Sequence, residues 1–267
     1  MSQDIALPFQ SSDSPLEQAI DRWIWVFMAA LFIAITLTGF IPDSLAKVAA
    51  VQSGRRPPFS LVLHLHAVLM GAFLLLLLSQ SILMATGRRG LHMLLGGLAF
   101  FIIPALVVVG FLLVPQTYRG LWYAAQAAPP PVQANLREIL GILENIALLQ
   151  LRSVIVLVVC VSLALRARRS DAESHKRLMF LATVVFMSAA FDRMTWLPTT
   201  MPNNPIAADL YTLLAISPML VWDLYRKHSL PRAYKTWLGV FVPVSLAVHL
   251  LWDKPGWHAI AAQMLSP

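Results

Sequence analysis

Several long apolar stretches constrain the fold of this chain more than any other feature. A helix that crosses a bilayer needs about 20 mostly apolar residues. The hydrocarbon core holds no water for backbone groups to bond, so only helices or closed barrels can span it. Seven segments near that length run from Trp23 to Ile41, Leu61 to Ala85, Met93 to Val114, Ile139 to Leu165, Leu178 to Leu197, Ala207 to Tyr225 and Trp237 to Trp252.

The overall composition also indicates a membrane protein. Hydrophobic residues make up 58% of the chain and charged residues only 12%, whereas soluble domains carry about 25% charged residues. We therefore expect an all-α polytopic membrane helix bundle with about seven transmembrane helices. Residues 1–22 are predicted to form an acidic tail, 23–252 a single transmembrane domain and 253–267 a short tail.

The longest predicted connection covers residues 115–137. It contains Pro129-Pro130-Pro131, a sequence typical of stiff, extended backbone. We predict an external loop there, because long connections in compact proteins commonly serve as lids or contact partners.

The charge distribution predicts both the partner and the orientation. The net charge is +7, but nucleic-acid binding needs basic residues gathered on a solvated face. Here they separate apolar runs, which favours a lipid bilayer as partner and no nucleic acid. Eleven Lys and Arg residues fall in the loops on one side and seven on the other. The positive-inside rule then predicts a cytoplasmic N-terminus and an external C-terminus.

Two histidines, His64 and His66, begin the second apolar segment. A charged group inside hydrocarbon costs roughly 2.5 to 3.5 kcal/mol, so membrane helices tend to keep ionisable residues where they are used. Because residues two apart point about 200° apart on a helix, the two rings cannot bind one metal ion together. Each histidine therefore needs partners from other helices.

The predicted topology brings further polar residues into the same outer leaflet. Arg152 is the deepest cation of its segment and has no near carboxylate in its own helix, so another helix, a cofactor or a substrate must balance its charge. Asp253 follows His249 by one helical turn and could orient its imidazole, as carboxylates do for metal-bound histidines. The other outer candidates are Glu144, Asp192 and Asp209.

These residues allow two kinds of cofactor. Haem b would suit an outer axial pair made of His249 with His64 or His66, accompanied by Arg152, since bis-histidine ligation favours electron transfer. The weaker inner pair, His92 and His175, is equally compatible with histidines facing lipid headgroups. A metal ion is the alternative to haem, with His66, His249, Glu144 and Asp192 as its predicted ligands.

Three motifs support a resemblance to known proteins. They are Gly39-Phe40-Ile41-Pro42 followed by His64-Leu65-His66, the turn Thr86-Gly87-Arg88-Arg89-Gly90-Leu91-His92, and the later His175-Lys176-Arg177-Leu178-Met179. With them the chain resembles a widespread group of uncharacterised bacterial multi-pass membrane proteins. The last motif is also distantly similar to haem-associated membrane proteins of oxidase assembly. The resemblance implies a bacterial inner-membrane location.

Two functions from different classes follow. One is a redox or electron-transfer protein whose outer-leaflet histidine site binds haem or a metal ion. The other is a non-catalytic accessory subunit of a larger membrane complex, or a homo-oligomer, whose polar residues join helices. Whether the protein is an enzyme is left open by its residues.

Overall fold

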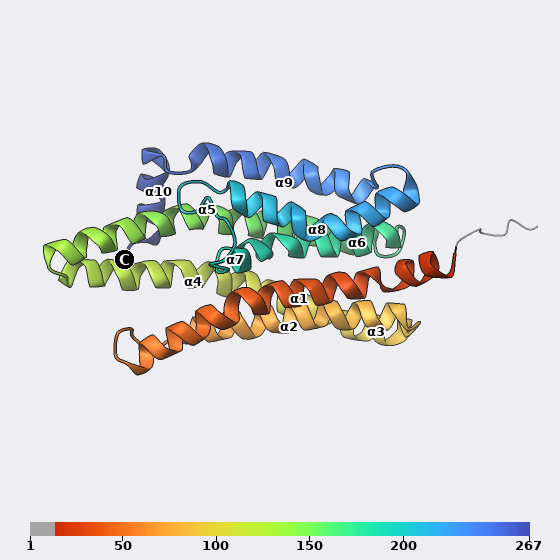
Figure 1. Ribbon diagram of the computed structural model, residues 1–267, viewed down its shortest axis with the longest axis horizontal. Coiled ribbons are helices and arrows are strands. Elements are labelled where there is room, and N and C mark those ends of the chain that lie inside the picture. Colours follow the sequence, from red (N-terminus) through yellow and green to blue (C-terminus); the bar gives the residue numbers. More distant parts are fainter. Residues whose placement is uncertain (1–13) are drawn as a thin grey trace, which may run out of the picture.

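The computed structural model describes residues 14–267, which form an elongated bundle of helices without any strand (Figure 1). The all-α prediction is therefore confirmed. The helices are α1 (Pro15–Gln52), α2 (Leu61–Ala85), α3 (Arg89–Gly96), α4 (Ala99–Ala127), α5 (Pro130–Ala167), α6 (Ala172–Thr183), the 3₁₀ turn η1 (Val184–Phe186), α7 (Met187–Phe191), α8 (Ile206–Lys227), α9 (Arg232–Leu251) and α10 (Pro255–Leu265). The predicted tail 1–22 falls partly outside the described residues, and α1 already begins at Pro15.

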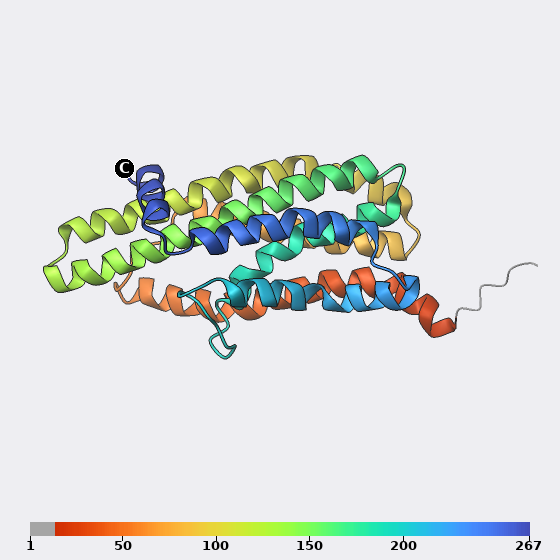
Figure 2. The same cartoon turned by 90° about the horizontal axis from the view of Figure 1, so that it is seen from above.

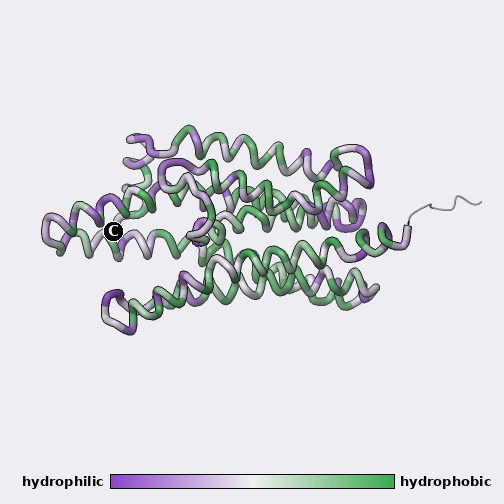
Figure 3. Tube along the Cα trace, in the orientation of Figure 1, coloured by the Kyte–Doolittle hydropathy of each residue, from purple (hydrophilic) through white to green (hydrophobic). Residues whose placement is uncertain are grey.

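Within the described part of the chain, six helices are long and apolar enough to cross a membrane: α1, α2, α3 with α4, α5, α8 and α9. Their middle sections are hydrophobic, and polar residues collect toward the two ends of the bundle (Figure 3). Large apolar side chains also cover the outside, such as Phe101 at 76% and Leu94 at 72% exposure. Soluble proteins do not present so much apolar surface to water, so this surface is suited to lipid.

The segment predicted to span from Leu178 to Leu197 is not one continuous helix. It is divided into α6, η1 and α7, and irregular chain follows Phe191. Pro198, Pro202 and Pro205 disfavour helix in the following residues 198–205, because proline lacks the N–H that a helix interior needs. The helical part is also enclosed by protein, with Leu181, Val184 and Val185 all at 0% exposure.

The external loop predicted over 115–137 is wrong. Helix α4 continues through Pro115 to Ala127, and α5 begins at Pro130, so the connection is only residues 128–129. The triple proline starts α5 instead of forming extended chain, because the first turn of a helix requires no backbone N–H. The Nε2 group of Gln133 also donates to the carbonyl of Ala125 at 3.1 Å, which ties the two helices together.

Further boundaries differ from the prediction. Helix α1 runs from Pro15 to Gln52 and α5 from Pro130 to Ala167, and both are longer than the predicted 23–41 and 139–165. The expected span from Met93 to Val114 is interrupted at Gly96 and Gly97, where α3 ends before α4 begins. The predicted tail 253–267 contains α10, which Pro255 begins and which packs on α4 and α5. Figures 1 and 2 both show α10 at the end of the bundle opposite to the start of α1.

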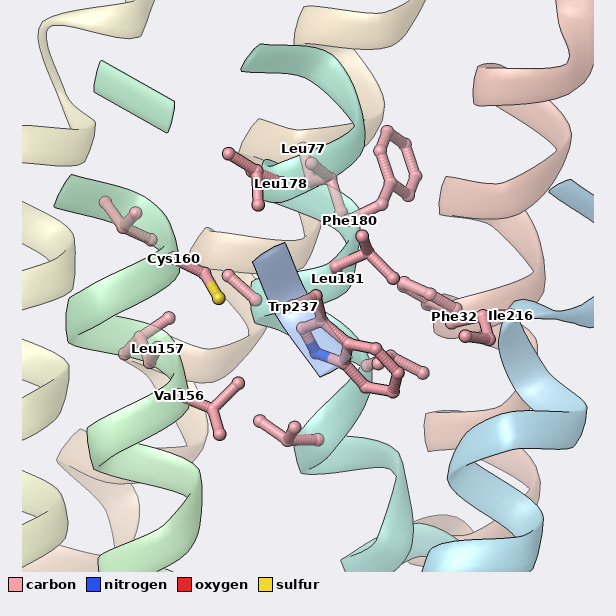
Figure 4. Packing of buried hydrophobic residues seen from close by; sticks show 14 of the residues in the cluster. Phe32, Leu77, Val156, Leu157, Cys160, Leu178, Phe180, Leu181, Ile216 and Trp237 are labelled. Atoms are coloured by element: carbon pink, nitrogen blue, oxygen red, sulfur yellow. The ribbon is translucent and has the colours of Figure 1, made fainter. Parts of the chain in front are cut away.

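The main hydrophobic core lies where α1, α5, α6, α8 and α9 meet. Figure 4 shows Trp237 of α9 among Leu181, Ile216 and Phe32. The ring of Trp237 stacks on Phe241 at 4.5 Å between centroids. Helix α6 packs on both α5 and α9 and so forms the centre of this core.

Gly39 of α1 permits the close approach of α1 to α7. A Cβ at this position would overlap the backbone of Ala190. We expect Gly39→Ala to lower the free energy of unfolding by about 1 to 3 kcal/mol, as overpacking typically does. Unfolding in a detergent titration measures this. Gly71→Ala is the matched control, because nothing lies within 4 Å of a Cβ there; equal effects of the two substitutions would contradict the close packing.

Candidate functional site

Arg152, in the middle of α5, is the centre of a buried polar cluster. Its side chain is 0% exposed, and Nη1 donates to the Asp209 carboxylate of α8. The same nitrogen lies 3.3 Å from Ser245 Oγ on α9, and the guanidinium lies 5.3 Å from the centroid of the Phe241 ring. Of the partners that the sequence left open for this charge, the structure shows a carboxylate on another helix.

Part of the Arg152 guanidinium has no protein acceptor. Its Nε and Nη2 atoms are buried and make no hydrogen bond with any of residues 14–267. Each unsatisfied buried donor costs about 1 to 3 kcal/mol. The arrangement therefore leaves two donors that could bind a water molecule or an acceptor group of a ligand.

His249 is the histidine of this cluster. Its Nε2 lies 2.8 Å from Asp209 Oδ2, so one carboxylate is shared between Arg152 and His249. The sequence predicted Asp253 as the partner of His249, and this is wrong. Helix α9 ends at Leu251 and Asp253 has a φ of 56°, so Asp253 does not lie one helical turn beyond His249.

A second polar cluster forms around Glu144, two turns before Arg152 on α5. Tyr118 of α4 donates to Glu144 Oε1 at 2.7 Å. On the other side, His258 Nδ1 lies 2.5 Å from Glu144 Oε2. Trp257 Nε1 donates to the Glu144 carbonyl at 2.8 Å. Glu144 thus anchors α10 to α4 and α5.

His258 lies between two carboxylates, because its Nε2 is 3.1 Å from Asp253 Oδ1. Burial opposes the charged imidazole, but the hydrogen bonds and charges of Glu144 and Asp253 outweigh it and raise the pKa of His258 above its ordinary 6.5. His258 was not among the predicted site residues. The sequence signal that could have indicated helix α10, and with it His258, is Pro255, since proline favours the first turn of a helix.

A third cluster lies at the opposite end of the bundle. Arg177 Nε of α6 donates to Asp223 Oδ2 of α8 at 2.7 Å, and Tyr234 of α9 donates to the same oxygen at 2.8 Å. Arg177 and Asp223 are each 3% exposed. These contacts connect three helices through one buried carboxylate, and the sequence did not predict them.

In the described residues, no contact joins His249 to His64 or His66, the predicted outer haem pair. His64 is exposed and its ring lies 6.0 Å from that of Phe59. His66 is half-buried, and its Nδ1 has no partner among the described residues. Helix α2 packs on α1, α3 and α4, whereas His249 belongs to α9, which packs on α5 and α6.

The predicted metal set His66, His249, Glu144 and Asp192 is not assembled. Within residues 14–267, no three His, Cys, Asp or Glu side chains are placed to hold one ion. Asp192 instead lines a cavity of about 10 Å³ with Ser188 and Tyr211. The physical reason is that α10, absent from the prediction, supplies the partner of Glu144, while α8 supplies that of His249.

The inner pair His92 and His175 is near enough for the two rings to interact electrostatically. His175 Nδ1 lies 2.9 Å from the Ala164 carbonyl. His92 Nδ1 is buried without a hydrogen-bond partner in the described residues.

No family model, curated protein or solved structure matches the chain. The resemblance described from the sequence motifs therefore stays a prediction.

We expect Arg152→Met to lower the free energy of unfolding by about 3 kcal/mol, because it leaves Asp209 without its cation. Asp209→Leu should also destabilise the protein, by leaving the guanidinium unpaired. The double variant should lose clearly less than the sum, since both charges are then gone. Detergent-induced unfolding measures all three. Arg137→Met, at an exposed arginine, is the control; additive losses would contradict a direct pair.

The docking of α10 should weaken at alkaline pH. A raised folded-state pKa means that the charged His258 bridge contributes fully below about pH 6.5 and is lost as the pH rises through that pKa. Hydrogen exchange of residues 255–265, corrected for intrinsic rates, should be faster near pH 9 than near pH 6. His258→Gln should remove this difference, whereas Tyr118→Phe should keep it. Unchanged protection in the wild type would refute the bridge.

Proposed function

We propose that this chain is a multi-pass membrane protein that exchanges a proton at His249, with Asp209 and Arg152 as positioning residues. The observation that carries the proposal is the Asp209 carboxylate shared between fully buried Arg152 and partly exposed His249. Ionisable chains of this kind within membrane helices typically mark ion or proton pathways.

Each member has a distinct part in this proposal. Arg152 stays cationic, and the Asp209 carboxylate balances its charge. The second oxygen of Asp209 orients the His249 ring through Nε2, which leaves Nδ1 free to take or give a proton. Histidine is the side chain that most readily changes charge near neutral pH. The side chain of His249 is 31% exposed and stands two residues before the end of α9, so it lies close to the end of the bundle, where a proton can enter.

The same geometry favours proton exchange over haem ligation at His249. Because Nε2 faces Asp209, a haem iron would have to approach Nδ1, which lies beside the residue's own main chain. A flat macrocycle would meet helix α9 there, whereas a proton or water would not. The free Nε and Nη2 donors of Arg152 could hold a water molecule of the same pathway.

For the topology we propose seven crossings with a cytoplasmic N-terminus, in a bacterial inner membrane. The start of α1 and α10 lie at opposite ends of the bundle (Figure 1), which agrees with an odd number of crossings. The run α6, η1 and α7 would add the seventh to the six long helices. The excess of Lys and Arg in the loops at the α1 end supports the orientation.

Infrared difference spectroscopy of the protein in lipid, after a pH step, tests the proposal. We expect an imidazole ring band that disappears in His249→Gln and changes in Asp209→Asn. His64→Gln is the matched control, because the His64 side chain is exposed and lies against the ring of Phe59. A His249→Gln spectrum identical to that of the wild type would overturn the proposal.

A redox function has one specific observation in its favour, the proximity of His92 and His175. A haem or metal ion held there would give an absorption band or metal content that His92→Ala removes and His249→Ala leaves intact. A folded, colourless and metal-free protein would contradict it.

A further inference from the structure

Two turns at the α1 end of the bundle carry arginines without acidic partners. Arg88 and Arg89 lie between α2 and α3, and Arg168 and Arg169 lie between α5 and α6; all four are exposed. The described residues contain no ion pair with any of them. Three nearby carboxylates have other partners: Glu173 pairs with Lys176 and Lys227, Asp223 pairs with Arg177, and Asp171 accepts from the Ser174 N–H at the start of α6.

These two turns meet at one corner of the bundle. The Arg168 guanidinium lies 6.0 Å from the ring of Phe100, in the first turn of α4. His92 of α3 interacts electrostatically with His175 of α6 and with Arg89. Both views show the α2–α3 and α5–α6 turns at the same end of the molecule (Figures 1 and 2). An anion bound at this corner would balance the charge of the four arginines.

Polar groups without partners lie beneath the arginines. His92 Nδ1 and Gln80 Nε2 are both buried and make no hydrogen bond within residues 14–267. His92 also lies against the backbone of Gln80. An acceptor such as a phosphate oxygen would satisfy the amide donor, and the histidine as well when its Nδ1 carries the proton.

The surface beside this corner is apolar and exposed. Leu94 is 72%, Met93 69% and Phe101 76% exposed, all on α3 or the start of α4. A ligand that suits the whole corner therefore has an anionic head and hydrocarbon tails. Free phosphate matches only the polar half.

We propose that this corner is a binding site for the headgroup of an anionic phospholipid. The phosphate binds the arginines of the two turns, since arginine matches phosphate with paired donors. The acyl chains lie along the exposed face of α3 and α4. Basic residues at the membrane surface attract anionic lipid additively, and the neighbouring histidine and glutamine make this corner selective for one lipid molecule.

Native mass spectrometry of the full chain in detergent, titrated with phosphatidylglycerol, tests the proposal. We expect one tightly retained lipid, and roughly 30-fold weaker binding for Arg88→Ala with Arg89→Ala. Arg168→Ala with Arg169→Ala should weaken binding similarly and serves as an independent second variant. Phosphatidylcholine should bind at least about tenfold more weakly than phosphatidylglycerol. Inorganic phosphate at millimolar concentration should not displace phosphatidylglycerol.

The matched control is Arg55→Ala with Arg56→Ala, an adjacent and exposed arginine pair at the other end of the bundle. It should leave phosphatidylglycerol binding unchanged. Equal retention of the two lipids, or wild-type binding by both arginine variants of the corner, would overturn the proposal. So would full competition by inorganic phosphate, or a haem or metal ion found bound to His92.

Discussion

The burial of Arg152 is the constraint on which the arrangement of α5, α8 and α9 depends. A guanidinium that is 0% exposed in an apolar bundle must have a counter-charge within reach. Asp209 provides it from the first turn of α8, and Ser245 approaches from α9. The positions of three helices are therefore coupled to one side chain. The same pairing places His249 against Asp209, so the structural contact and the proposed proton site share one carboxylate.

Buried polar contacts recur along the bundle, and each joins helices that apolar packing alone would hold less specifically. Asp223 connects α6, α8 and α9 through Arg177 and Tyr234. Glu144 connects α4, α5 and α10 through Tyr118 and His258. In lipid, helices gain little hydrophobic energy by associating with one another, so close packing and polar contacts determine their arrangement. Gly39 provides the close packing at the contact between α1 and α7.

The sequence predicted the long apolar helices well but not where they end. Runs such as 61–85 matched the structure because apolar length is a local property, and Ser60 caps the N-terminus of that helix. The triple proline was misread as a loop because proline is compatible both with extended chain and with a helix start. The segment from Leu178 to Phe191 is enclosed by other helices, and a hydropathy pattern does not contain that enclosure.

The sequence by itself determined an all-α membrane protein and identified Arg152 as a buried cation that needs a partner, since length, apolarity and charge are properties of single segments. Only the tertiary structure decided which partners meet. His249 pairs with Asp209 of another helix and not with Asp253 nearby in sequence, while His258 takes Asp253 and Glu144. The reason is geometric: hydrogen bonds act over about 3 Å, and the packing of whole helices sets which side chains come that close.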